Sequence, residues 1–246
     1  MNFQALKEII NPGDLILFKG VDFVSKSICK IETFVNGNGD YSHVGVVVNK
    51  RFLPTIEELK EDKLYILEST CTIPHITDGV PDVRTKRVRF GVQLRDLDLV
   101  VKMYEKNGGK VAWSKLKYNP FLYNKDIPKI MTKLINKIGY KKYDFFILDM
   151  FAAAFPKLRK ARAKFEGFEY EGNLILSTLD IVERSTKEDI KYKMLFCSEL
   201  VCMVYQEIGL IDKKLDPMNV MPSDYISNRY KELSNLFDKP IEIIYK

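Results

Sequence analysis

The segment HVGVVV at residues 43–48 restricts the fold of this chain more than any other feature. Four of these six residues are valine, and a side chain branched at Cβ favours the extended backbone of a β-strand. Alternating apolar residues at 88–94, followed by the run 99–101, predict a hairpin. Together these segments predict a mainly antiparallel sheet. Three more short apolar segments predict further strands: residues 14–18, 64–67 and 111–116.

Helical patterns alternate with these strands. Asp126 is the expected N-cap of one helix and Gly139 its C-terminal stop. The polar stretch 157–193 predicts an insertion, so we expect one α+β domain, residues 1–246, whose sheet packs against the helix at 196–208. Helices are predicted at residues 2–10, 21–35, 127–138 and 196–208, with a short one within 54–61.

Composition excludes several classes of protein. With 46% apolar and 12% aromatic residues, the chain is neither collagenous, nor a coiled-coil rod, nor of low complexity. The net charge of +6 is too small to argue for specific nucleic-acid binding, and no zinc-finger spacing accompanies it.

The four cysteines lack CxxC spacing and the N-terminus lacks the anatomy of a secretory signal, so we expect the cytoplasm or another reducing compartment. No cofactor or metal is predicted.

A basic segment follows the most apolar stretch of the chain. The apolar stretch, residues 145–155, has eleven residues interrupted by Asp149, well short of the roughly 20 that span a bilayer. Beside it, the basic segment predicts either a solvated loop or docking on an anionic membrane surface. Its cations are Lys157, Arg159, Lys160, Arg162 and Lys164.

The chain has two histidines, His43 and His75, and histidine is the side chain best suited to acid–base chemistry at neutral pH. His43 opens the 43–48 strand, where it shares a face with Gly45, and a glycine there leaves room for another group. His75 lies in a polar loop and reads as a surface residue. His43 is therefore the better candidate for a general base.

Cys197 stands at the start of the 196–208 helix. The positive end of a helix favours a thiolate over a thiol, which is what a nucleophilic cysteine requires. Its position on the apolar stripe of the helix directs the thiol towards the sheet. Glu68, on the strand after the one that carries His43, is the natural third member, because a buried carboxylate needs a partner. Read singly, each residue is more often structural than catalytic.

Five blocks of sequence resemble the circularly permuted papain-like cysteine hydrolases, the YaeF/YiiX group of the NlpC superfamily, to which the lecithin:retinol acyltransferase-like enzymes are related. In that group, as here, the histidine strand precedes the cysteine helix. The blocks are PGDLILF at 12–18, YSHVGVVV at 41–48, YILEST at 65–70, YDFF at 143–146 and FCSELVCMVYQEIGL at 196–210.

The resemblance implies a permuted papain-like fold and a Cys197 nucleophile, with His43 as base and then acid and Glu68 as the orienting residue. It also matches Tyr143 to a tyrosine that contacts the oxyanion or the substrate. The implied activity is that of a thiol hydrolase (amidase or peptidase) or an acyltransferase acting on a small amide, a peptide or a lipid. The alternative is a non-catalytic binding or membrane-surface protein that retains this fold.

Overall fold

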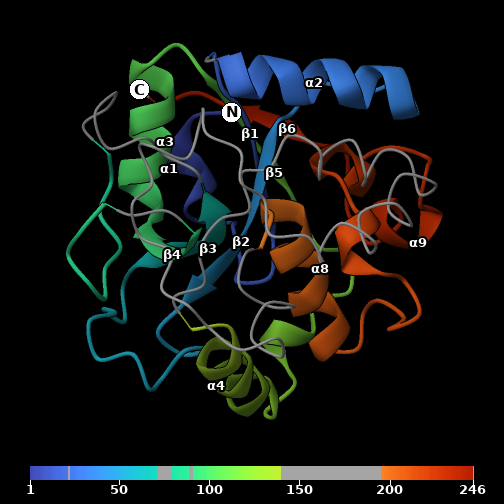
Figure 1. Ribbon diagram of the computed structural model, residues 1–246. Helices are drawn as coiled ribbons and strands as arrows, with labels where there is room; N and C mark the ends of the chain where they lie inside the picture. The colour runs from blue at the N-terminus through green and yellow to red at the C-terminus, as the bar shows by residue number, and fades with distance from the viewer. Residues whose placement is uncertain (22, 71–78, 89–90, 140–194, 246) are drawn as a thin grey trace, which may run out of the picture.

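The computed structural model describes every residue except 22, 71–78, 89–90, 140–194 and 246. The described residues form an α+β fold around one six-stranded sheet of order β4-β3-β2-β1-β5-β6 (Figure 1). Every neighbouring pair of these strands is antiparallel. The strands are β1 Leu15–Lys19, β2 His43–Asn49, β3 Leu64–Thr70, β4 Gly91–Asp96, β5 Lys110–Ser114 and β6 Ile241–Ile243.

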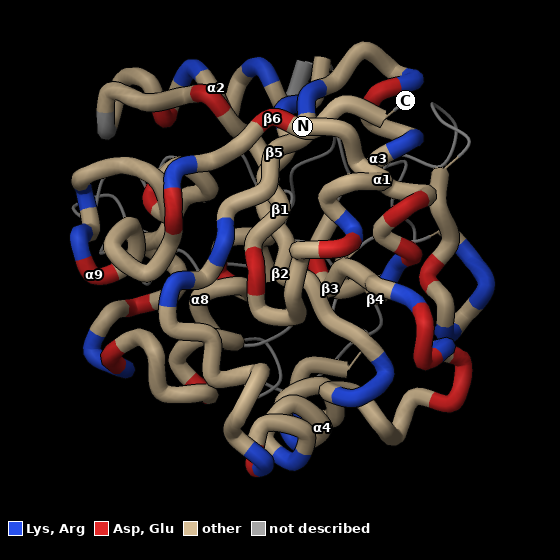
Figure 2. Tube along the Cα trace, turned by 180° about the vertical axis from the view of Figure 1, so that it is seen from behind, with Lys and Arg blue, Asp and Glu red and all other residues tan. Residues whose placement is uncertain are grey.

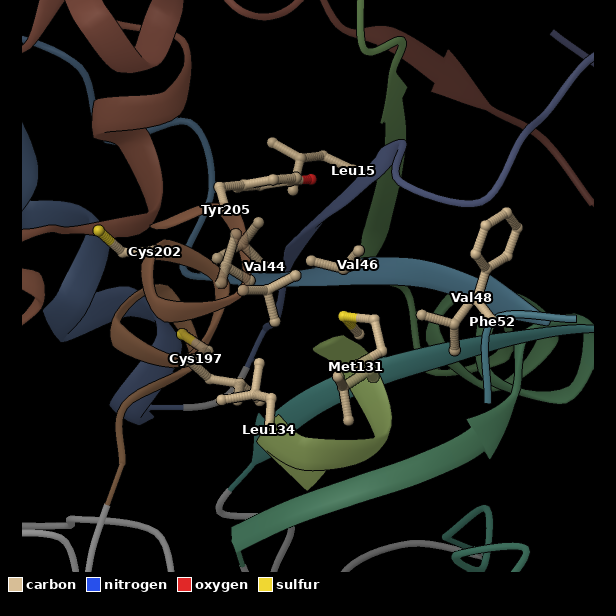
Figure 3. Close-up of a cluster of buried hydrophobic side chains, with 14 of the residues drawn as sticks. Leu15, Val44, Val46, Val48, Phe52, Met131, Leu134, Cys197, Cys202 and Tyr205 are labelled. Carbon is tan, nitrogen blue, oxygen red and sulfur yellow. The ribbon is translucent and has the colours of Figure 1, made fainter. Parts of the chain in front are cut away.

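Helices cover both faces of the sheet, and each face has its own apolar cluster. Val44, Val46 and Val48 of β2 pack against α4 and α8 (Figure 3). Val47 faces the other way, into a cluster that includes residues of α1 and α3. The α-helices are α1 Phe3–Leu6, α2 Phe23–Asn36, α3 Leu97–Lys106, α4 Ile127–Ile138, α8 Cys197–Glu207 and α9 Lys231–Ser234.

Three short 3₁₀ helices complete the described elements. They are η1 Pro120–Leu122, η3 Pro217–Asn219 and η4 Pro222–Tyr225. The third of them lies close to the beginning of α8, because Tyr225 donates a hydrogen bond from its hydroxyl to the carbonyl oxygen of Ser198 (2.8 Å). This contact bears on the site described below.

The antiparallel sheet and the principal helices match the sequence predictions, but the predicted hairpin is wrong in its second half. Residues 99–101 belong to α3. Asp96 ends β4 and caps that helix, because its side chain accepts the backbone N–H groups of Asp98 and Leu99. The buried residues Leu97, Val100 and Val101 lie three and four positions apart, which is helical spacing.

Smaller differences concern local capping and length. Asp126 makes no side-chain cap to α4, although the helix has the predicted bounds and Gly139 follows it with a positive φ of 52°. The first helix ends at Leu6, and residues 54–61 form turns. Strand β6 was not predicted. The polar stretch 157–193 lies outside the described residues, and no helix among those described is long and apolar enough to cross a membrane.

Candidate active site

His43 and Glu68 form a buried pair on neighbouring strands. His43 begins β2 and is 8% exposed, and Glu68, on β3, is fully buried. The two strands pair with Val47 opposite Ile66, which places both side chains on the face that carries Val47. The imidazole Nε2 lies 2.5 Å from Glu68 Oε2. Because the carboxylate is ionised, Nε2–H is the donor, and Nδ1 is the nitrogen left for another partner.

Arg95, on β4, is the second partner of Glu68, and sequence analysis missed it. Its Nε donates to Glu68 Oε1 (2.6 Å), and its Nη2 lies 2.6 Å from the same oxygen. Burial alone would raise the pKa of Glu68, but the charge of Arg95 and the hydrogen bond from His43 lower it to about 2. Glu68 is therefore a permanent buried anion. The only hint in the sequence was general: a buried carboxylate needs a cation, and Arg95 falls within an alternating apolar segment.

Cys197 is the first residue of α8 and is 2% exposed. Helix α8 packs on β2 and β3, and the sulfur lies among the buried side chains on the sheet face that carries Val44 and Val46, opposite to the face that carries Val47 (Figure 3). Leu195, just before the helix, is held by the hydroxyl of Ser69 at the end of β3 (2.5 Å). The N-terminus of α8 is thereby fixed beside the end of β3, close to where β2 begins.

The imidazole of His43 interacts with Cys197 through their charges and a side-chain hydrogen bond. Burial alone would lower the pKa of His43, but Cys197 and Glu68 together raise it to about 9. The structure therefore favours an imidazolium held between the ionised Glu68 and the side chain of Cys197. Such an arrangement holds a proton ready for a leaving group and stabilises a thiolate.

Gly45 lies on β2, and side chains of the neighbouring strand β3 already fill the space above it. A Cβ at this position would stand 2.6 Å from side-chain atoms of Ile66 and 3.1 Å from the Cβ of Glu68. As predicted, the absence of a side chain at Gly45 leaves room for other groups. The groups that use the room are the side chains of β3, and the close approach helps Glu68 reach His43.

A cleft of about 520 Å³ opens at the C-terminal end of α2. Its walls come from α2 and from the residues that follow η4. The same two segments meet deeper in the protein, where Ser223 donates its backbone N–H to Glu32 (3.3 Å). The lining residues are Val35, Asn38, Ile226, Ser227, Asn228 and Arg229.

Two sets of predicted residues lie outside the described part of the chain: Tyr143, and the basic segment of Lys157, Arg159, Lys160, Arg162 and Lys164. Their roles stay predictions. Over the described residues, basic and acidic side chains are interspersed (Figure 2). Among these residues no group of three or more His, Cys, Asp or Glu side chains is placed to hold a metal ion.

Comparison with known proteins gives distant structural neighbours and no assignment of a family. No family model matches the sequence, and no curated protein matches it. The chain is similar to the crystal structure of a metalloprotein, YiiX from Escherichia coli O157:H7, with 14% sequence identity and a TM-score of 0.40. The alignment covers 96% of this chain and 97% of that one. A TM-score this low carries no argument about fold or activity, so the geometry of the site must support any function.

Proposed function

We propose that this protein is a thiol hydrolase, acting as an amidase or peptidase, or an acyltransferase that forms an acyl-enzyme on Cys197. The proposal rests on one observation: His43 lies 2.5 Å from a buried, ionised Glu68 and also interacts with Cys197. A nucleophilic cysteine, a histidine base next to it and a carboxylate that orients the histidine are the groups that covalent acyl transfer requires.

In this mechanism the sulfur of Cys197 attacks a carbonyl carbon and the C=O electrons move to oxygen. The imidazolium of His43 then protonates the leaving group as the acyl-enzyme forms. Neutral His43 next removes a proton from water or from a second acceptor, whose oxygen or nitrogen attacks the thioester carbon. The C–S bond then breaks, which releases the product and returns the thiolate of Cys197 beside the imidazolium. Glu68 fixes the tautomer and orientation of the ring, and Arg95 keeps Glu68 ionised. The backbone N–H of Cys197, at the positive end of α8, is a donor to the oxyanion.

We further propose that the fold is the circularly permuted papain-like fold. Two features support this: the chain order His43, Glu68, Cys197, and the packing of the cysteine helix against an antiparallel sheet. Tyr143 is proposed as a further contact to the oxyanion or the substrate. The choice between water and a second acceptor decides between hydrolase and acyltransferase.

The test uses the other cysteines of the same chain as internal controls. Burial raises the pKa of Cys202 to about 12 and also raises that of Cys29, so both should stay unreactive at pH 7. Iodoacetamide, small enough for a buried thiol, should alkylate Cys197 first. After reaction with p-nitrophenyl acetate, peptide mass spectrometry should detect an acetyl group on Cys197. His43→Ala should slow both reactions. Alkylation of Cys197 no faster than of Cys29 or Cys202, or no acetylation of Cys197, would refute the proposal.

A further inference from the structure

A second carboxyl group, Glu32 of α2, lies near Cys197 and has no role in the mechanism above. Glu32 is fully buried. Its Oε1 accepts the backbone N–H of Ser223 (3.3 Å), whereas Oε2 has no hydrogen-bond partner within the described structure. A buried carboxylate with an open oxygen costs several kcal/mol, so a structural role alone gives no reason for this residue type.

Hydrogen bonds tie Glu32 to the beginning of α8. Ser198, next to Cys197, donates its hydroxyl to Val220 O (2.6 Å) and accepts the hydroxyl of Tyr225 at its carbonyl oxygen (2.8 Å). Ser223, which binds Glu32, lies between those two residues in the chain. The segment 220–225 therefore connects Glu32 to the first turn of the helix that presents the thiol.

Burial, with nearby negative charge, favours the protonated form of Glu32. Burial raises its pKa well above the ordinary value, the hydrogen bonds from Ser223 oppose this, and the charges of Asp224 and Cys197 raise it further. Asp224 pairs with Arg229 (3.2 Å). Cys29, on the same face of α2, is another titratable neighbour, and burial raises its pKa. Glu32 is accordingly a neutral carboxylic acid, which carries an O–H donor.

We propose that Glu32 donates a hydrogen bond from its carboxylic acid to the carbonyl oxygen of the acyl group that Cys197 attacks. The inference rests on the proposed function and names a further catalytic residue for it. As the S–C bond forms, the C=O electron pair moves to oxygen, and the O–H of Glu32 and the N–H of Cys197 stabilise the charge. The proton stays on Glu32, and the oxygen returns its electrons to carbon as His43 protonates the leaving group.

Two substitutions of Glu32 test whether it acts as a hydrogen-bond donor or only fills space. Glu32→Gln keeps the shape and supplies an N–H donor, whereas Glu32→Leu keeps the volume and removes the donor. Thr33→Ala, at the exposed neighbouring position of α2, controls for changes in the helix. For each protein the burst of p-nitrophenolate from p-nitrophenyl acetate measures acylation of Cys197. Iodoacetamide alkylation, which forms no oxyanion, measures the reactivity and access of the thiol.

Glu32→Leu should slow acylation by about 10²- to 10³-fold, the usual effect of losing one oxyanion donor, with alkylation unchanged. Glu32→Gln should stay within about tenfold of the wild type, and Thr33→Ala should match it. Equal acylation by Glu32→Leu and wild type, equal loss of acylation and alkylation, or a Glu32→Gln variant as slow as Glu32→Leu would each overturn the inference while the proposed function stands. A wild-type protein that forms no acetyl-enzyme would overturn both.

Discussion

Two buried carboxyl groups, one near each end of β2, have opposite electrostatic surroundings. Asp14 and Glu68 are both fully buried. Asp14 accepts neutral donors only: the backbone N–H groups of Asn11 and Leu116 and the indole N–H of Trp113, each at 2.9 Å. Burial outweighs these bonds and raises its pKa. Glu68 has a guanidinium and an imidazole as partners, and its pKa is lowered to about 2.

The difference indicates a structural role for Asp14 and fits the proposed catalytic role of Glu68. Asp14 links the turn at Asn11 to Trp113 of β5 and to Leu116 beyond the end of that strand, and neutral donors suffice for that purpose. In the proposed mechanism, Glu68 lies beside a histidine that is cationic until it protonates the leaving group, and an anion stabilises that cation. Buried ion pairs are weak evidence for stability, so the pairing of Glu68 is better explained by the site than by the fold.

The largest effect is expected from Arg95→Met, which leaves Glu68 with His43 alone. Because one partner of a buried ion pair is removed, the free energy of unfolding should fall by about 3–5 kcal/mol, measured by urea denaturation at pH 7. Lys63→Met is the matched control. It breaks a more exposed pair with Asp96 and should cost less than about 1 kcal/mol. Equal losses in the two variants would contradict the charge assigned to Glu68.

The double variant Arg95→Met/Glu68→Gln sharpens the same point. Removing both charges should restore much of the lost stability, because a neutral amide is less costly to bury than an unpaired carboxylate. Acylation of Cys197 by p-nitrophenyl acetate should remain slow, since no anion orients His43. Recovery of both stability and acylation would show that Glu68 is only structural.

At the other end of the strands, Asp14→Asn should lower the free energy of unfolding by about 1–3 kcal/mol. The amide offers one acceptor oxygen where the carboxyl uses two, and its NH₂ group faces N–H donors. The rate of Cys197 acylation per folded molecule should not change. Urea denaturation and a titration of the p-nitrophenolate burst measure the two quantities, and a loss of acylation in fully folded protein would break the comparison.

A smaller loss of stability is expected from Gly45→Ala. Overpacking against Ile66 costs about 1–3 kcal/mol, and removing a glycine from a strand returns about 0.5–1 kcal/mol, so the net loss should be at most about 2.5 kcal/mol. In the double variant with Ile66→Ala, which removes the clashing atoms, the two losses should sum to more than the measured loss. Strict additivity in urea denaturation would show that the two side chains do not compete for space.

Sequence could predict the elements with strong local patterns, and it singled out the residues of the proposed triad within them. HVGVVV specifies β2 by its β-branched residues, and the helical stripe with Gly139 specifies α4. The run 99–101 misled, because the capping by Asp96 decided for a helix over the β-propensity of valine. Arg95 and Glu32 stayed hidden, since each acquires its meaning from a partner on a distant element. Such pairings depend on register and packing, which no local pattern records.

The smallest effect, and the one that tests the comparison most directly, is the pH dependence of stability. A lowered pKa means that Glu68 contributes stability above its ordinary value of 4.5, and this contribution is lost as the pH falls through about 2. A raised pKa means that the contribution of Asp14 is present below its ordinary value of 3.8 and is lost as the pH rises through the higher folded value. Between pH 6 and pH 3, the advantage of wild type over Glu68→Gln should therefore shrink, while its advantage over Asp14→Asn should grow. Urea denaturation of the three proteins at each pH measures both slopes, and slopes of the same sign would mean that the two carboxyl groups share one electrostatic environment after all.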